Sequence, residues 1–194
     1  MGAKREDFAR MASEIEINRL GAPIGKQDQY AAAYGGLRRY AFNPDGSVKI
    51  STYKCTQAVQ SAMMLFRTDL PRASDESIFS SMDTAKLLKM KTLIPEFIQA
   101  LSYSDLNTIG KCLHRNWVLK RSLNEFISND ALNAIYTSAI EAGALGGKLL
   151  GAGGGGYFLF CVEENDQAEV IEALDGRAEH IPFKFESKGT HIIE

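Results

Sequence analysis

A dense run of glycines near the C-terminus is the segment of this sequence with the strongest chemical implication. Seven of the eleven residues from Gly146 to Gly156 are glycine. Glycine inside an element costs roughly 0.5–1 kcal/mol relative to alanine, so the run disfavours folding unless the backbone needs positive φ or a close approach. Successive N–H groups without side chains form a concave nest that binds phosphate. A flexible hairpin or a tight crossing between packed elements is the alternative explanation.

The run does not fit two common phosphate-binding motifs. No Gly-Lys-Ser/Thr sequence ends it, which excludes the P-loop pattern. The apolar segment from Tyr157 to Val162 follows at once and predicts a buried strand, whereas a helix follows the glycines of a dinucleotide-binding fingerprint.

Asp28 is the best candidate for proton chemistry. It lies between Gln27 and Gln29, and Lys26 precedes this group. A neighbouring lysine favours the ionised form of an aspartate, and this carboxylate can accept a proton or a hydrogen bond from a hydroxyl group. The two glutamines offer donors and acceptors that suit a polyhydroxylated ligand. On this loop alone, a polar surface loop before a helix, with Asp28 as an ordinary cap, is the simpler interpretation.

Several basic residues are weaker candidates for contacting a substrate phosphate. Four of them share one predicted helix with Trp117, where the solvated face of an amphipathic helix explains them more simply. Two others flank Pro71 in a predicted loop. These residues are His114, Arg115, Lys120 and Arg121 on the helix, and Arg67 and Arg72 around the proline.

The pattern of elements predicts an α+β fold. An N-terminal helix stops at Gly21, and a hairpin spans Leu37 to Tyr53 around the turn residues Asn43 to Gly46. The run Ala62–Phe66 predicts a strand covered on both faces. Helices fill residues 74–143, with Pro95 either kinking one of them or beginning a new one.

The C-terminal part completes this order of elements. A helix is expected over 164–174 and a last strand over 181–185, where Ile181, Phe183 and Phe185 alternate. The order of strand, helices, glycine loop, strand, helix and strand predicts helices gathered on one face of a mainly antiparallel sheet.

Composition narrows the class of protein. The 194 residues carry 22 basic and 24 acidic side chains, a net charge of −2, which argues against nucleic acid as a partner. No apolar run reaches the ~20 residues that span a bilayer, and the first ten residues are too charged for a signal peptide. The three cysteines lie far apart and form no CxxC pair, which favours a reducing compartment and argues against zinc. A cytoplasmic protein without a membrane partner is the expectation.

Two segments of this sequence together resemble two motifs of the GHMP kinases. They are Gly21–Gln29, which Gly35-Gly36 follows, and Lys148–Gly156. The first is similar to the loop that carries the catalytic aspartate, and the second to the family's third, glycine-rich motif. Within the family, the amino-acid sequence of Pro23–Gly36 is most similar to that of the sugar kinases that phosphorylate a heptose 7-phosphate. The resemblance runs over nearly the whole chain.

The resemblance implies ATP-dependent phosphorylation of the anomeric hydroxyl of a heptose phosphate, with Mg²⁺, in nucleotide-sugar and cell-surface polysaccharide synthesis. Asp28 would orient or deprotonate that hydroxyl, and Lys26, Gln27 and Gln29 would contact the sugar phosphate. The loop of Gly151, Ala152, Gly153, Gly154, Gly155 and Gly156 would close over the phosphates. No residue is assigned to the metal. Residues 1–55 would be a remnant of the family's N-terminal domain, and residues 56–194 its C-terminal domain with a ferredoxin-like sheet.

One departure from the family pattern bears on activity. The main ATP phosphate loop of the family, Pro-x-x-x-Gly-Leu-Gly-Ser-Ser, has no match before Gly21. We therefore expect this chain to be a C-terminal portion that binds ATP poorly by itself and turns over little or nothing. Apolar faces of the first helix and the hairpin would be left uncovered, which predicts association as a homodimer or with the N-terminal portion of the same kinase.

Two other functions fit the same residues. One is a non-catalytic remnant that keeps the glycine loop and binds a sugar phosphate or a protein partner. The other is a small-molecule regulatory domain with a ferredoxin-like core and no kinase ancestry.

Overall fold

The computed structural model describes residues 4–71 and 83–192, which form two compact units. The first unit comprises Met1–Cys55 with Lys184–Glu194, and the second comprises Thr56–Phe183. Arg72 and the start of the predicted helical region at 74–82 lie outside the described residues. The assignment of residues 1–55 and 56–194 to the two domains of the family stays a proposal.

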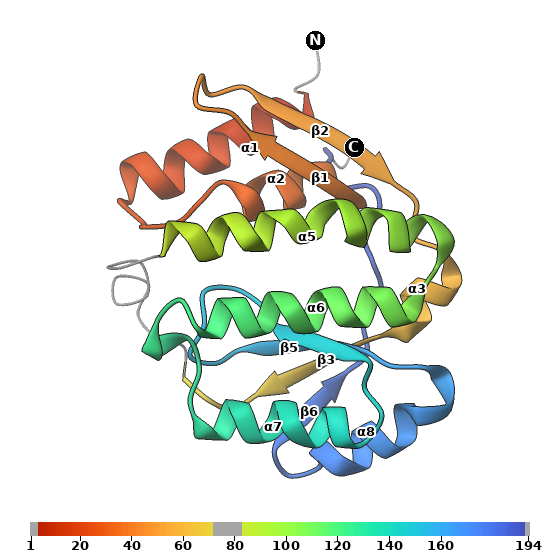
Figure 1. Ribbon diagram of the computed structural model, residues 1–194. Coiled ribbons are helices and arrows are strands. Elements are labelled where there is room, and N and C mark those ends of the chain that lie inside the picture. Colours follow the sequence, from red (N-terminus) through yellow and green to blue (C-terminus); the bar gives the residue numbers. More distant parts are fainter. Residues whose placement is uncertain (1–3, 72–82, 193–194) are drawn as a thin grey trace. The chain divides into compact units, whose positions relative to one another are not determined.

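The first unit contains three helical segments and a hairpin (Figure 1). They are α1 (Arg5–Ser13), the π-helix η1 (Glu14–Arg19), α2 (Gln27–Tyr34), β1 (Leu37–Phe42) and β2 (Val48–Tyr53). Gly21 has a φ of +69°, and the helical backbone ends before it, as predicted. The hairpin is also confirmed, because Leu37 pairs with Tyr53 and Phe42 with Val48 across the expected turn.

The C-terminal segment is bound to the end of α2. The amide of Gly36 donates to the carbonyl of Glu186 at 2.7 Å, and the amide of Thr190 donates to the carbonyl of Ala32 at 3.0 Å. A Cβ on Gly35 would lie 2.9 Å from the Cα of Gly189, so this crossing requires glycine. Four aromatic rings then pack α2 against the hairpin: Tyr30, Tyr34, Tyr40 and Phe42.

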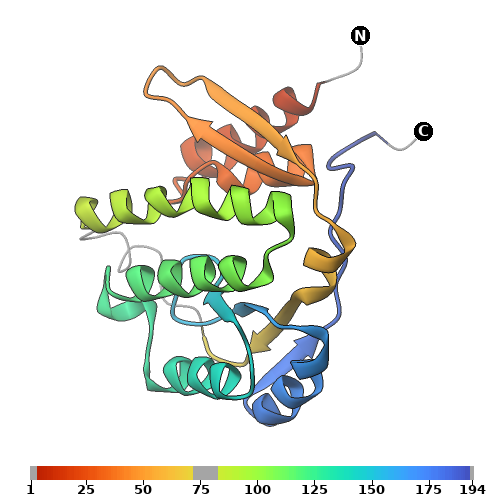
Figure 2. The same cartoon turned by 45° about the vertical axis from the view of Figure 1, so that its right-hand side comes forward.

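The second unit is a four-stranded antiparallel sheet with helices, in the strand order β4-β5-β3-β6 (Figure 2). Its strands are β3 (Met63–Thr68), β4 (Gly146–Leu149), β5 (Tyr157–Cys161) and β6 (Ala178–Ile181). Its helices are α3 (Gln57–Ala62), α5 (Thr84–Tyr103), α6 (Leu106–Arg121), η2 (Glu125–Ile127), α7 (Asp130–Glu141), η3 (Glu164–Asp166) and α8 (Gln167–Leu174). The predicted α+β class is confirmed.

One face of this sheet carries the core. Phe66 and Phe158 are cross-strand partners and fully buried, and they pack in one cluster with Trp117 of α6, Leu132 of α7 and Leu174 of α8. The cluster places α6, α7 and α8 on that face, and α5 packs along α6 (Figure 1).

The other face of the sheet is only partly covered. Leu65 and Leu159, which are cross-strand partners, alternate with the buried phenylalanines and are half-buried. The prediction of a strand covered on both faces was therefore wrong. A continuous apolar run does not distinguish one buried face from two, because tertiary packing decides what covers the second face.

Pro95 lies inside the single helix α5, which agrees with the first of the two alternatives and excludes a new helix beginning there. Its missing N–H costs that helix a backbone hydrogen bond. One further sequence prediction needs correction. The last strand is Ala178–Ile181, so Phe183 and Phe185 lie beyond it. Here β6 pairs with β3 through Leu65↔Ile181 to Thr68↔Ala178, and this pairing fixes its bounds. The alternating aromatic residues that suggested a later strand lie outside that register.

Candidate functional site

Asp28 lies in the first turn of α2, and its side chain is exposed. Lys26 occupies the N-cap position, so Asp28 is not the helix cap that the simpler interpretation expected. A carboxylate in the first turn is stabilised by the unpaired N–H groups and the positive end of the helix dipole. Lys26 and Gln27 are exposed beside it. The segment therefore presents an acceptor oxygen to the surface from a fixed backbone.

Gln29 differs from its neighbours because it is buried. Its amide nitrogen donates to Glu16 Oε2 at 2.7 Å, while its Oε1 is buried without a hydrogen-bond partner. Glu16 and Gln29 line a hollow of about 510 Å³ with Asp28, Thr190 and apolar side chains of α1 and α2. Sequence reasoning missed Glu16, since nothing in a helical run of mixed charges distinguishes one glutamate.

The glycine run divides into two structural parts. Gly146–Leu149 forms strand β4, and residues 150–156, which we call the glycine turn, connect it to β5. Gly151, Gly153, Gly154 and Gly156 have φ between +71° and +146°, which favours glycine. A Cβ on Gly155 would collide with the backbone oxygen of Leu70 and lie 2.9 Å from that of Pro71. Close crossing of packed backbones thus accounts for part of the glycine density.

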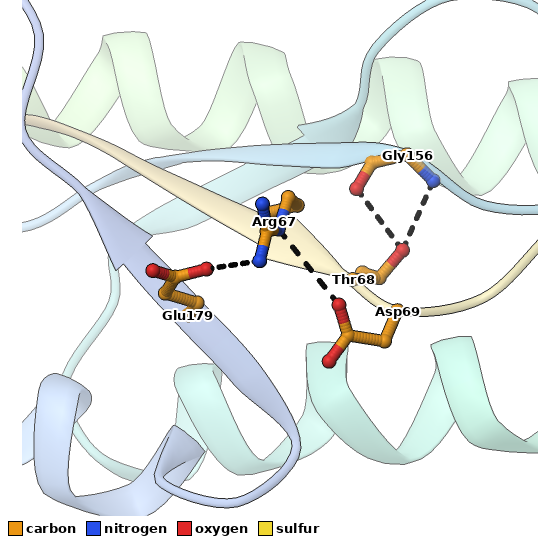
Figure 3. Close-up of polar contacts among 5 residues, drawn as sticks. All are labelled: Arg67, Thr68, Asp69, Gly156 and Glu179. Atoms are coloured by element: carbon orange, nitrogen blue, oxygen red, sulfur yellow. Dashed lines mark hydrogen bonds and ion pairs between the residues drawn. The ribbon is translucent and has the colours of Figure 1, made fainter.

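Thr68, at the end of β3, holds the last residue of the turn (Figure 3). Its hydroxyl accepts a hydrogen bond from the amide of Gly156 and donates to the carbonyl, both at 3.0 Å. Its own amide donates to the same carbonyl at 2.7 Å. Thr68 is 4% exposed, so these bonds lie in the protein interior. Sequence reasoning missed this residue, and a single threonine ending an apolar strand was the available signal.

Lys120 holds the opposite end of the turn. Its ammonium donates to the carbonyl of Leu149 at 2.9 Å and to that of Gly151 at 2.6 Å. Lys120 is buried, so its interpretation as part of a solvated helix face was wrong. Burial, with a smaller contribution from Lys148, lowers the pKa of Lys120 to about 7. An amphipathic pattern does not predict the burial of Lys120, because a long side chain at the margin of the apolar stripe can point either into the protein or into solvent.

A third contact holds the middle of the turn. The amide of Gly154 donates to the carbonyl of Ile127 at 3.0 Å, and a Cβ on Gly153 would lie 2.8 Å from the Cα of Ile127. Because Gly154 and Gly156 use their amides inside the protein, the run is not an open nest along its whole length. The candidate donors for an anion lie at its start, where Gly151 is exposed and Ala152 is half-buried.

The other basic candidates have local partners. Arg115 pairs with Glu96 of α5 at 2.6 Å, and Arg67 pairs with Glu179 at 2.5 Å, beside Asp69 (Figure 3). The remaining helix residues have neutral partners: His114 Nδ1 lies 2.7 Å from the hydroxyl of Tyr136, and Arg121 donates to Asn133 at 3.3 Å.

The cysteines and metal-binding groups give no additional site. Cys55, Cys112 and Cys161 form no disulfide. Within residues 4–71 and 83–192, no three or more His, Cys, Asp or Glu side chains gather as a metal site. In the same part of the chain, none of the helices combines the length and apolarity needed to cross a membrane.

The comparison with protein families identifies the second unit. Residues 93–180, which include α6, the glycine turn and most of the sheet, match the family model described as GHMP kinases C terminal. This chain contains a GHMP kinase C-terminal domain. This match confirms the resemblance to the family, and it includes the second of the two sequence motifs, Lys148–Gly156.

Sugar kinases are among the proteins to which this chain is similar. D-glycero-alpha-D-manno-heptose 7-phosphate kinase of Campylobacter jejuni is 31% identical over 94% of this chain and 58% of its own length. A galactokinase of Mycobacterium tuberculosis is 24% identical over 88% of this chain and 57% of its own. A crystal structure titled D-glycero-D-manno-heptose 1-phosphate kinase, from Bacteroides thetaiotaomicron, matches with a TM-score of 0.74 at 26% identity, over 100% of this chain and 57% of that one. The chain thus spans less than two thirds of the length of these relatives.

Proposed function

We propose that this protein is an ATP-dependent kinase that phosphorylates the anomeric hydroxyl of a heptose phosphate. The match to the Campylobacter heptose 7-phosphate kinase over 94% of the chain carries the proposal. The structural neighbour titled as a heptose phosphate kinase supports the same substrate class. ATP and Mg²⁺ are the co-substrate and metal that this chemistry uses, since the metal bridges and neutralises phosphate oxygens.

We assign Asp28 to the acceptor hydroxyl. Its exposed carboxylate, fixed in the first turn of α2, can orient the hydroxyl and take its proton. Lys26, Gln27 and Gln29 are proposed to contact the sugar phosphate. The start of the glycine turn is proposed to bind phosphate through backbone amides. Phosphoryl transfer needs positioning and charge neutralisation more than covalent chemistry, which these groups supply.

The test measures ADP release with ATP, Mg²⁺ and a panel of sugar phosphates. The chain is assayed alone and together with the part of the Campylobacter relative that it does not match. We expect release that depends on a heptose phosphate when that part is present, and little from the chain alone. Asp28→Asn should lower kcat by about 10²–10⁴-fold. Asp45→Asn, the same change in the hairpin turn, is the matched control.

Two results would contradict the proposal. The first is full activity of Asp28→Asn, which would remove the assigned role of that carboxylate. The second is binding of a sugar phosphate without turnover in any form, which would favour the non-catalytic binding protein instead.

A further inference from the structure

Lys120 is the one buried lysine or arginine among the described residues. It has two hydrogen-bond acceptors, the carbonyls of Leu149 and Gly151, and no acidic partner. The ion pairs found in residues 4–71 and 83–192 involve Arg67 and Arg115 and leave Lys120 out. A buried cation without an anion is costly, so its retention in this position needs an explanation.

Among the described residues, the one charged side chain known to act on Lys120 is another cation. Lys148 in β4 is half-buried and disfavours the charged form of Lys120. Arg121 follows it in α6, and Lys86 of α5 donates to the carbonyl of Ser122, two residues further on. This end of α6 therefore gathers positive charge beside the glycine turn. An anionic ligand at the turn would supply the missing negative charge.

The hydrogen bond from Lys120 also fixes the direction of one amide. The peptide between Gly151 and Ala152 is trans and planar, so its N–H points away from its carbonyl oxygen. Because that oxygen faces Lys120, the amide of Ala152 is directed to the opposite side. Within the part of the chain that the structure describes, this amide has no hydrogen-bond acceptor. Ala152 itself is half-buried and follows the exposed Gly151.

We propose that Lys120 is a positioning residue of the glycine turn, which holds the carbonyls of Leu149 and Gly151 on its own side. The Ala152 amide then donates to a phosphate oxygen of the ligand on the other side of this peptide, and the Lys120 ammonium attracts that phosphate across the peptide without contacting it. The identity of the ligand as a phosphate-bearing substrate rests on the proposed kinase function.

Inorganic pyrophosphate, titrated into the ¹⁵N-labelled full chain, tests this role. We expect the amide signals of Gly151 and Ala152 to shift, with those of Gly154 and Gly156 changing less. Lys120→Met should raise the dissociation constant for pyrophosphate at least tenfold. Lys120→Arg, which keeps the charge, should recover part of the lost affinity. Lys111→Met removes the same charge from an exposed position on the same helix and should bind like the wild type.

A second measurement separates a charge role from a purely structural one. The ¹³Cε signal of Lys120 is followed through a pH titration, with and without pyrophosphate. A bound anion stabilises the ammonium, so its titration midpoint should rise when pyrophosphate is present. A lysine that only supports the fold would keep its midpoint.

The proposal is overturned if the wild type does not bind pyrophosphate, if binding shifts other amides only, or if folded Lys120→Met binds with unchanged affinity. It is also overturned if Lys120→Met keeps wild-type kcat and KM in an active kinase, a result that leaves the proposed function intact. Conversely, binding at Ala152 that depends on Lys120, in a protein that phosphorylates no sugar, supports the role of Lys120 and contradicts the kinase.

Discussion

Replacing Thr68 by valine tests whether the hydroxyl of this residue holds the glycine turn in place. Valine keeps the shape of threonine but substitutes a methyl group for the oxygen that the Gly156 amide contacts at 3.0 Å. The Gly156 carbonyl keeps its bond from the Thr68 amide, so one buried N–H loses its only partner. An unsatisfied buried donor costs about 1–3 kcal/mol. We expect the free energy of unfolding of the second unit to fall by about 2 kcal/mol.

Urea unfolding followed by tryptophan fluorescence measures this change, because Trp117 is the single tryptophan and is fully buried in the core of that unit. Thr68→Ser is the matched control, since it keeps the hydroxyl and loses a methyl group worth about 0.8 kcal/mol. A decrease below about 0.5 kcal/mol for the valine variant, or a larger loss for serine than for valine, would refute the reasoning.

Three further predictions concern neighbouring groups. Gly155→Ala should destabilise the second unit more than Gly151→Ala, because a Cβ at position 155 collides with backbone atoms. A Cβ at position 151 meets open space, so that variant bears only the roughly 1–2 kcal/mol cost of an L-residue at a φ of +71°. Equal losses of the free energy of unfolding in urea would contradict this. The pKa of Lys120, about 7 in the fold against 10.5 for the ordinary side chain, means that the unfolded chain binds a proton that the folded chain releases between these values. Stability should therefore rise with pH across this interval by at most about 1.4 kcal/mol per unit, and Lys120→Met should reduce the rise measured at pH 6 to 9. Arg67→Ala should change stability by less than about 1 kcal/mol, since Arg67 and Glu179 are about half exposed, and a larger loss would show that this pair is stronger than solvent screening allows.

The local signals of the sequence were sufficient for the hairpin, for the first and last helices and for the helical character of residues 84–141. Asn43–Gly46 determines the turn between β1 and β2 because its residue types favour turn backbones wherever they occur. Asp83, Asp105 and Asn129 each cap a helix by accepting amide hydrogen bonds, a local interaction that needs no distant partner. Bounds that depend on pairing were less predictable, as the earlier end of β6 shows.

The sequence by itself determined that the backbone around Gly146–Gly156 must turn sharply and approach other groups closely, since glycine is tolerated at such density for few other reasons. It also placed Asp28 among small and polar residues where an exposed carboxylate can act. Only the tertiary structure decided which groups hold the glycine turn. Thr68 and Lys120 are distant from it in the chain, and the choice between burying and exposing a lysine depends on which carbonyls the folded backbone brings to it.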